Sequence, residues 1–305
     1  MNITITGSLG NVGRRLTEKL VARGHRVTVV SHSPERIAAM EALHAIPAIG
    51  SLQDAAFLQE AFAGADAVYI MIPPDPSATN VRKYIREAGD RYAQVIARCG
   101  VQYVVNLSSI GAHIPDGAGP AGANYYVEQK LNALADTHVL HLRPGMFYTN
   151  FLGAMNMIRY QNIIGNNFDA SLNMILSHPH DIADAAAEAL HTRSFSGKKI
   201  QYIASDERNG SEIASVLGRA IGQPDLAWIN ISDEQMLQGM LQNGLTEEMA
   251  TVYILDIGRA IRESKLFDDY AKNRHTALGS IKLEDFAKEF AVIYKQALAM
   301  AGEAK

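Results

Sequence analysis

The first 145 residues alternate short apolar runs with segments of helical periodicity, and this alternation constrains the fold more than any other feature. Most runs are unbroken stretches of β-branched or aliphatic residues, which is typical of parallel strands buried on both faces. The runs are Ile3–Thr6, Arg26–Val30, Ile46–Ile49, Ala67–Ile72, Tyr103–Leu107 and Val139–Leu142. The pattern predicts an α/β fold with a doubly wound parallel sheet and right-handed crossovers. An eight-unit barrel is the alternative.

The rhythm changes after Arg143-Pro144-Gly145. Residues 146–178 show no clear strand alternation, Asp181 is expected to cap a helix over 182–190, and 199–204 is expected to form a strand. From Ser211 onward the pattern is mostly helical and predicts a last helix with one apolar face, formed by Phe286, Phe290, Ile293 and Leu298. We therefore expect a first domain over 1–150, with 179–204 returning to it, and a smaller, mostly helical domain over 151–305.

Composition excludes several classes of protein. The 28 Lys and Arg against 32 Asp and Glu give a net charge of −4, which argues against a nucleic-acid or anionic-membrane partner. Cys99 is the single cysteine, so no intrachain disulfide exists. Nothing in the chain is long and apolar enough to suggest a membrane span, and the start MNITITG has no signal-peptide plan. We expect a soluble, cytoplasmic protein, and no metal site, since His178 and His180 alone rarely make one.

The strongest local motif is a glycine-rich turn between the first strand and the first helix. It reads Gly7-Ser8-Leu9-Gly10-Asn11-Val12-Gly13. A dinucleotide diphosphate needs backbone N–H groups at close range, and side chains at the turn would block it. The position of the motif, after a strand and at the head of a βαβ series, is the context that dinucleotide binding requires. It also argues against the barrel.

The tip of the second strand bears on the choice of coenzyme. An NAD-selective site usually places Asp or Glu there to bond the ribose hydroxyls. Here the tip carries no acid, and a 2′-phosphate would be surrounded by Ser31, His32, Ser33 and Arg36. Glu35 is the one opposing charge, and its position at a helix start leaves open that it points away. We expect NADP(H) to be preferred over NAD(H).

Taken in order, these and later motifs resemble the NmrA-like branch of the atypical short-chain dehydrogenase/reductases over essentially the whole chain. The later motifs are Gly64–Pro74, Asn106-Leu-Ser-Ser109, Leu142-Arg143-Pro144-Gly145, His178-Pro-His-Asp181 and Leu283–Ala287. The resemblance implies a Rossmann domain that binds NADP(H) and a small substrate domain. One departure is that the family's Arg-x-Pro-x-Lys appears as His32-Ser33-Pro34-Glu35-Arg36, which weakens the NADP preference without reversing it.

The resemblance also implies where the rest of the coenzyme contacts lie. Ile72, Pro73 and Pro74 would flank the adenosine ribose, and Leu107 and Ser108 would approach the nicotinamide. The carboxamide would lie near Pro144, Gly145, Met146 and Phe147.

Short-chain dehydrogenases use a Tyr-x-x-x-Lys pair in which the lysine, one helical turn away, lowers the pKa of the phenol. Tyr126 and Lys130 match this spacing, and Ser109 stands where the superfamily places a substrate-polarising hydroxyl. The alternative is a structural helix whose aromatic side packs and whose lysine is solvated. Tyr125 is a second candidate to face the nicotinamide.

A flat acceptor would bind near these residues. The predicted substrate contacts are Ser109, Tyr125, Tyr126, Phe147, Tyr148, Asn150 and His178. Core packing is the competing interpretation for Phe147 and Tyr148. The first functional hypothesis is an NADPH-dependent reductase of a small conjugated acceptor, a quinone by preference. The alternatives are a non-catalytic NADP(H)-sensing regulator and an NAD(P)-dependent epimerase or isomerase. A homodimer or a protein partner is left open, and the mixed-charge helix Arg82–Arg98 is expected to be either a solvated face or a subunit contact.

Overall fold

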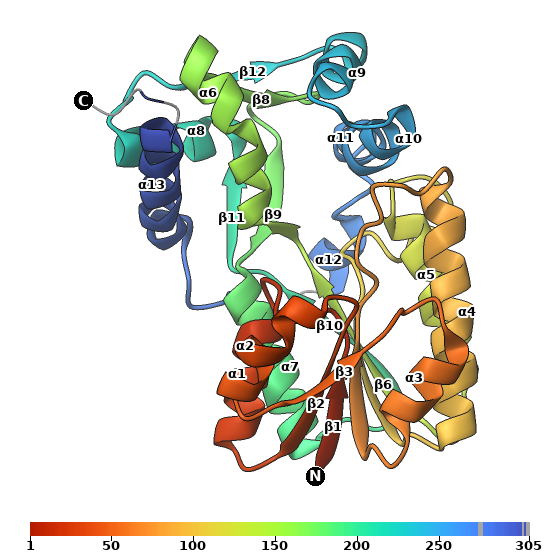
Figure 1. Cartoon of the computed structure of the whole chain (residues 1–305). Helices are drawn as coiled ribbons and strands as arrows, with labels where there is room; N and C mark the ends of the chain where they lie inside the picture. The colour runs from red at the N-terminus through yellow and green to blue at the C-terminus, as the bar shows by residue number, and fades with distance from the viewer. Residues whose placement is uncertain (274–276, 301, 303–305) are drawn as a thin grey trace. The chain divides into compact units, whose positions relative to one another are not determined.

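The computed structural model describes residues 1–273, 277–300 and 302 (Figure 1). The chain divides into two compact units, one made of Met1–Pro144 and Ile182–Tyr202, the other of Gly145–Asp181 and Ile203–Lys305. The first division therefore follows Pro144, earlier than the residue 150 expected from the sequence, and the returning segment is 182–202 in place of 179–204.

The first unit is built on a seven-stranded sheet in the order β10-β6-β5-β4-β1-β2-β3. The strands from β1 to β6 pair in parallel, as the unbroken apolar runs predicted. Their bounds are β1 Asn2–Ile5, β2 Arg26–Ser31, β3 Ile46–Ile49, β4 Ala67–Ile70, β5 Tyr103–Leu107 and β6 His138–Pro144, with β10 at Lys198–Ile203. All four residues of β4 are buried, which explains why this run shows no polar alternation.

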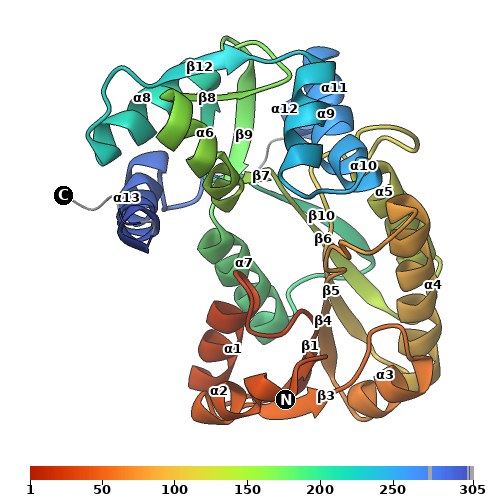
Figure 2. The ribbon, with the colours of Figure 1, turned by 45° about the horizontal axis from the view of Figure 1, so that its top comes forward.

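Helices cover both faces of this sheet, which gives three layers (Figure 2). One face carries α1 (Gly13–Ala22), α2 (Ile37–Ala42) and α7 (Pro179–Thr192), and the other carries α3 (Ala55–Phe62), α4 (Val81–Cys99) and α5 (Ala121–Asn132). Asp184 joins α7 to α1 through ion pairs with Arg15 at 2.6 Å and Lys19 at 2.9 Å. Charge therefore fixes the returning helix beside the helix that follows the glycine turn.

The second unit contains a three-stranded sheet, a parallel two-stranded sheet and most of the remaining helices. The strands are β7 Met146–Phe147, β9 Asn173–Ser177 and β11 Asp206–Asn209 in one sheet, and β8 Ile163–Asn166 and β12 Ala227–Asn230 in the other. The helices are η2 Tyr148–Ala154, α6 Met155–Gln161, α8 Gly210–Ile221, α9 Asp233–Gln242, α10 Glu247–Ala250, the π-helical η3 Thr251–Leu255, α11 Asp256–Arg262, α12 Asp268–Asn273 and α13 Leu283–Met300. Within the described residues, no helix could cross a lipid bilayer.

Several expectations for the second unit are wrong. Residues 146–178 contain three strands of two to five residues, too short to display an alternating pattern, and β12 interrupts the region expected to be helical. The inward face of α13 is formed by Phe286, Phe290 and Tyr294, while Ile293 is 37% exposed. Ile293 was predicted on the buried face because it is more apolar than Tyr294. The i, i+4 spacing from Phe286 and Phe290 instead places Tyr294 on that face.

Asp181 is also not the helix cap that the sequence suggested. It lies in the first turn of α7, and its carboxylate accepts hydrogen bonds from the Ser205 hydroxyl at 2.6 Å and from Ser280. A Cβ on Gly279 would lie 2.2 Å from the same carboxylate, so only glycine fits there. Asp181 therefore fastens the segment that leads into α13.

Candidate functional site

The glycine-rich turn joins the end of β1 to the start of α1. Gly7 has φ +94°, and a Cβ there would lie 2.6 Å from Met71. A Cβ on Gly13 would lie 2.1 Å from the Ser8 carbonyl oxygen, so the turn closes on itself only with glycine at this position. The close neighbours of Gly13 are thus backbone atoms of the turn itself. A Cβ on Gly10 would meet nothing nearer than 3.4 Å, so the fold does not explain that glycine.

Polar groups in this turn lack protein partners. No side chain caps the start of α1, and its first turn contains no acidic residue. The backbone N–H groups of residues 9–12 find no acceptor within the described part of the chain, and the shielded Ser8 hydroxyl has no hydrogen-bond partner there. A helix N-terminus with unpaired amides attracts anions. The turn therefore fits a diphosphate, and the open space beside Gly10 would let the diphosphate approach the backbone closely.

The tip of β2 lies beside this turn, because the Ser8 N–H donates to the Val30 carbonyl at 3.0 Å. Ser31 is buried, and its hydroxyl oxygen accepts the Ser33 N–H at 3.1 Å, which shapes the tip. His32 and Arg36 are exposed, as contacts for a 2′-phosphate should be. Ser33 precedes a short 3₁₀ helix, η1 (Pro34–Arg36), but makes no capping bond; its hydroxyl donates to Glu35 Oε1 at 2.6 Å.

The segment after β4 is tied to the same region. The Met71 N–H donates to Thr6 Oγ1 at 2.9 Å, directly before the glycine turn. Pro73 accepts a hydrogen bond from the Tyr84 hydroxyl at 3.1 Å, while Ile72 and Pro73 are half-buried and Pro74 is exposed. The carboxyl ends of β1, β2 and β4 thus meet along one edge, where ligands bind in open parallel sheets.

A buried ionic network lies under the next strand end and was not anticipated from the sequence. The Ser108 hydroxyl, just after β5, donates to Glu128 Oε1 at 2.5 Å. Arg143 on β6 binds both oxygens of Glu128, at 3.0 and 2.7 Å, and also donates to the Tyr202 hydroxyl and the Ala112 carbonyl. Arg143 is 4% exposed and Glu128 1%. The sequence signal that could have predicted this network is Arg143, a charged residue at the end of an apolar strand, because a buried arginine needs an anionic partner.

The comparisons with known proteins begin with this part of the chain. Residues 7–150 match the model of a protein family described as NAD(P)H-binding. The match confirms the expectation of NAD(P)H binding, and its range opens at Gly7, the first residue of the glycine turn.

Other relatives agree with this fold at low identity. The chain is 23% identical over 249 residues to the NAD(P)H azoreductase of Xenophilus azovorans, covering 81% of this chain and 83% of that protein. The structure of an NADPH-dependent quinone oxidoreductase from Escherichia coli, complexed with NADPH, matches with TM-score 0.77 and 19% identity over 94% of this chain and 99% of that one. A nucleoside-diphosphate-sugar epimerase from Staphylococcus aureus matches with TM-score 0.77 and 15% identity, over 94% and 100%. The α/β fold and the resemblance drawn from the motifs are confirmed; the structural likeness alone selects no reaction.

Tyr126 and Lys130 both lie on α5 of the first unit, and both contact Asp90 of α4. The Tyr126 hydroxyl lies 3.0 and 3.1 Å from the two oxygens of Asp90, and Lys130 Nζ lies 3.2 Å from the same carboxylate. Hydrogen bonds to Tyr126 and Asp90 raise the pKa of Lys130, which keeps the ammonium charged. This geometry favours the structural alternative for the pair. Tyr125, on the same helix, is half-buried.

The predicted residues near the nicotinamide have different environments. Leu107 and Ser109 are half-buried, and the Ser109 hydroxyl makes no hydrogen bond within the described residues. Pro144 is buried at the end of β6. Gly145 begins the second unit, where its N–H donates to the Ser177 hydroxyl at 2.8 Å and a Cβ would lie 2.3 Å from the Ile175 carbonyl oxygen. Gly145 therefore has a packing role within its own unit.

Two predicted substrate contacts are core residues of the second unit. Tyr148 is fully buried and stacked on Phe286, with ring centroids 5.3 Å apart. His178 is 2% exposed, its ring lies beside that of Tyr148, and its Nδ1 accepts the His180 N–H at 3.1 Å. This burial favours the packing interpretation for Tyr148, and contact of either residue with substrate stays a prediction. The remaining predicted contacts are more accessible: Met146 and Phe147 are half-buried, and Asn150 is exposed.

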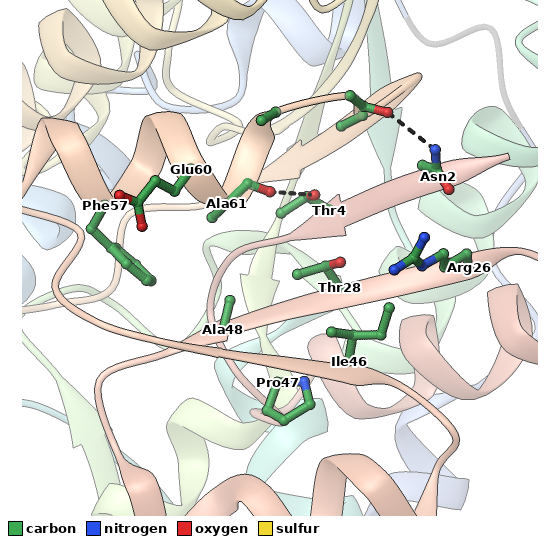
Figure 3. A pocket seen from close by; sticks show the side chains of 13 residues that line it. Asn2, Thr4, Arg26, Thr28, Ile46, Pro47, Ala48, Phe57, Glu60 and Ala61 are labelled. Carbon is green, nitrogen blue, oxygen red and sulfur yellow. Dashed lines mark hydrogen bonds between the residues drawn. The ribbon is translucent and has the colours of Figure 1, made fainter.

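A cavity of about 420 Å³ lies elsewhere in the NAD(P)H-binding unit (Figure 3). Its walls come from the amino-terminal halves of β1 and β2, from β3, from α3 and from the turn after α3. Asn2, Thr4 and Thr28 give it a polar floor, while Phe57 and Glu60 come from the helix. Because coenzymes bind at the carboxyl ends of parallel strands, this cavity is not the coenzyme site. No group of three or more potential metal ligands is assembled among the described residues.

Proposed function

We propose that this protein is an NAD(P)H-dependent reductase that prefers NADPH and transfers hydride to a small conjugated acceptor, such as a quinone. The observation that carries the proposal is the glycine turn, whose amides and Ser8 hydroxyl have no protein partners and whose Gly10 leaves room for a diphosphate. The proposal gains support from the azoreductase of Xenophilus azovorans, which matches this chain over 81% of its length. It also gains support from the quinone oxidoreductase fold of Escherichia coli.

Residues 7–13 would hold the diphosphate, with Ile72, Pro73 and Pro74 beside the adenosine ribose. Bound NADPH supplies hydride from C4 of its nicotinamide. The Ser108 hydroxyl donates its proton to the Glu128 carboxylate, so that its oxygen would serve the nicotinamide carboxamide as an acceptor. The Ser109 hydroxyl is available to donate to a carbonyl oxygen of the acceptor, and Tyr125, in the same unit, remains a candidate contact for its ring.

Reduction of a quinone needs little contribution from a catalytic acid–base pair. Hydride addition to a quinone forms an aromatic hydroquinone anion, which water protonates, so that most of the rate enhancement comes from positioning. A site without a free tyrosine acid is therefore adequate for a quinone. The engagement of Tyr126 and Lys130 with Asp90 weakens the sequence argument for an epimerase, which rested on that pair.

The test is NADPH oxidation, followed by absorbance, against a panel of quinones and azo dyes at saturating coenzyme. We expect turnover that depends on the acceptor. Coenzyme binding without turnover on any acceptor would refute the reductase assignment.

Coenzyme preference is tested separately. His32 and Arg36 are the exposed cationic candidates at the β2 tip. Arg36→Ala should therefore weaken NADPH binding more than NADH binding, and an equal effect on both would contradict this placement.

A second candidate is a regulator that binds NADP(H) without turnover, and the bound state of Tyr126 and Lys130 favours it. Coenzyme occupancy would then change the affinity for another protein, and by reciprocity the partner would change the affinity for coenzyme. Pull-downs with and without NADP(H) test this candidate. Identical sets of bound proteins, or none, would refute it.

A further inference from the structure

The serine at the start of η1 has an unusual role. Serine at this position normally accepts a hydrogen bond from a backbone N–H two or three residues later. Ser33 has the extended backbone of a capping residue, with φ −105° and ψ 106°, but makes no such bond. Its hydroxyl donates instead to Glu35 Oε1 at 2.6 Å. This hydrogen bond therefore holds the exposed Glu35 carboxylate beside Ser33 at the β2 tip.

The β2 tip is fixed in place on both sides of this contact. Ser31 Oγ accepts the Ser33 N–H, and the Val30 carbonyl accepts the Ser8 N–H from the glycine turn. In dinucleotide-binding folds this position faces the 2′-position of the adenosine ribose. An acid here usually accepts a hydrogen bond from the 2′-hydroxyl of NAD, and an arginine nearby accommodates the 2′-phosphate of NADP. At the tip of β2, Glu35 therefore favours NAD, whereas Arg36 favours NADP.

We propose that Glu35 is a specificity-determining residue that limits the preference of this site for NADPH, because its carboxylate accepts a hydrogen bond from a ribose 2′-hydroxyl and repels a 2′-phosphate. The inference rests on the proposed coenzyme site. One oxygen of Glu35 is engaged by Ser33, and the other is left to accept from a ribose hydroxyl. His32 and Arg36 attract the 2′-phosphate, and Glu35 opposes them, so that NADH and NADPH both bind.

Glu35 carries its charge at neutral pH. The hydrogen bond from Ser33 lowers the pKa of its carboxyl, and its own backbone N–H and the nearby side chains of Arg36 and His32 act in the same direction. The Ser33 hydroxyl, which sequence reasoning assigned to the 2′-phosphate, already serves this carboxylate. The attraction for a 2′-phosphate therefore falls mainly on His32 and Arg36.

The test compares the affinities of 2′,5′-ADP and 5′-AMP by calorimetry, because these probes differ only in the 2′-phosphate and need no turnover. Glu35→Gln keeps an oxygen that accepts from Ser33 and removes the charge. We expect this variant to shift the affinity ratio toward 2′,5′-ADP by roughly five- to tenfold, the size expected for one exposed charge beside a phosphate. The shift should shrink at high salt, since exposed charges are screened.

Glu60→Gln is the matched control, since it makes the same change at an exposed glutamate on α3, which lies on the other face of the sheet. It should leave the affinity ratio unchanged. Equal ratios in wild type and Glu35→Gln, or an equal shift in Glu60→Gln, would overturn the inference. Failure of both nucleotides and both coenzymes to bind the wild-type protein would instead overturn the proposed function.

Discussion

Acid should destabilise this protein through a histidine buried inside its NAD(P)H-binding sheet. His141 on β6 is 1% exposed. Its Nδ1 lies 3.1 Å from Asn106 Nδ2 on β5, and its Nε2 lies 3.0 Å from Asn132 Oδ1. The neighbours thus suit a neutral ring that accepts at Nδ1 and donates at Nε2. Protonation would set two donors face to face at Nδ1.

Burial lowers the pKa of His141 from 6.5 to about 4, and the nearby Arg143 and Lys198 add to this effect. Between these two values the unfolded chain binds the extra proton and the folded chain does not. The contribution to stability is therefore complete above about pH 6.5 and is lost as the pH falls toward 4. Linkage gives a loss of about 2 kcal/mol between pH 7 and pH 5 from this residue alone.

Urea unfolding of wild type and His141→Gln at several pH values measures this term, because other titrating groups contribute equally to both proteins. Glutamine costs stability at pH 7 but does not titrate. The stability advantage of wild type over the variant should therefore shrink by about 2 kcal/mol from pH 7 to pH 5. A constant difference across this range would refute the assignment of a buried, neutral His141.

Three other predictions follow from the contacts of single residues. Gly13→Ala should weaken NADPH binding, measured by calorimetry, on the order of tenfold or more, because its Cβ would displace the Ser8 carbonyl. Gly153→Ala is the control and should leave NADPH binding unchanged, because a Cβ there meets nothing within 4 Å. Equal effects of the two substitutions would contradict the reasoning. Tyr126→Phe should keep acceptor turnover within about twofold, whereas loss of a general acid would cost roughly 100-fold or more. Glu128→Gln should cost about 3–5 kcal/mol in urea unfolding, because it leaves the Arg143 charge buried without its partner, and a loss below about 1 kcal/mol would contradict this.

The fold of the NAD(P)H-binding unit was largely predictable because its strands are buried on both faces. The runs around β3 and β5 were predicted with their observed bounds, and the glycine turn stands where the motif required it. The second unit was less predictable, since strands such as β7 and β8 are too short to show a period. Tyr148 illustrates the same difficulty, because an aromatic residue that packs in a core cannot be distinguished by sequence from one that stacks on a ligand.

The candidate site was likewise predictable only in part. Backbone requirements at Gly7 and Gly13 are visible in the sequence, because only glycine satisfies them. Side-chain direction is not visible: the spacing of Tyr126 and Lys130 matched a catalytic pair, yet the third partner, Asp90, lies 36 positions before the tyrosine, on another helix. The buried ion pair of Glu128, on the same helix as Tyr126, could not be predicted either, because its partner Arg143 lies on the following strand.

The most direct test of the account is calorimetric titration of the purified protein with NADPH and NADH. The account predicts saturable binding of one coenzyme per chain, competed by ADP, because the amides of residues 9–12 would bind the diphosphate that all three ligands share. Absence of binding by either coenzyme would contradict the account at its foundation.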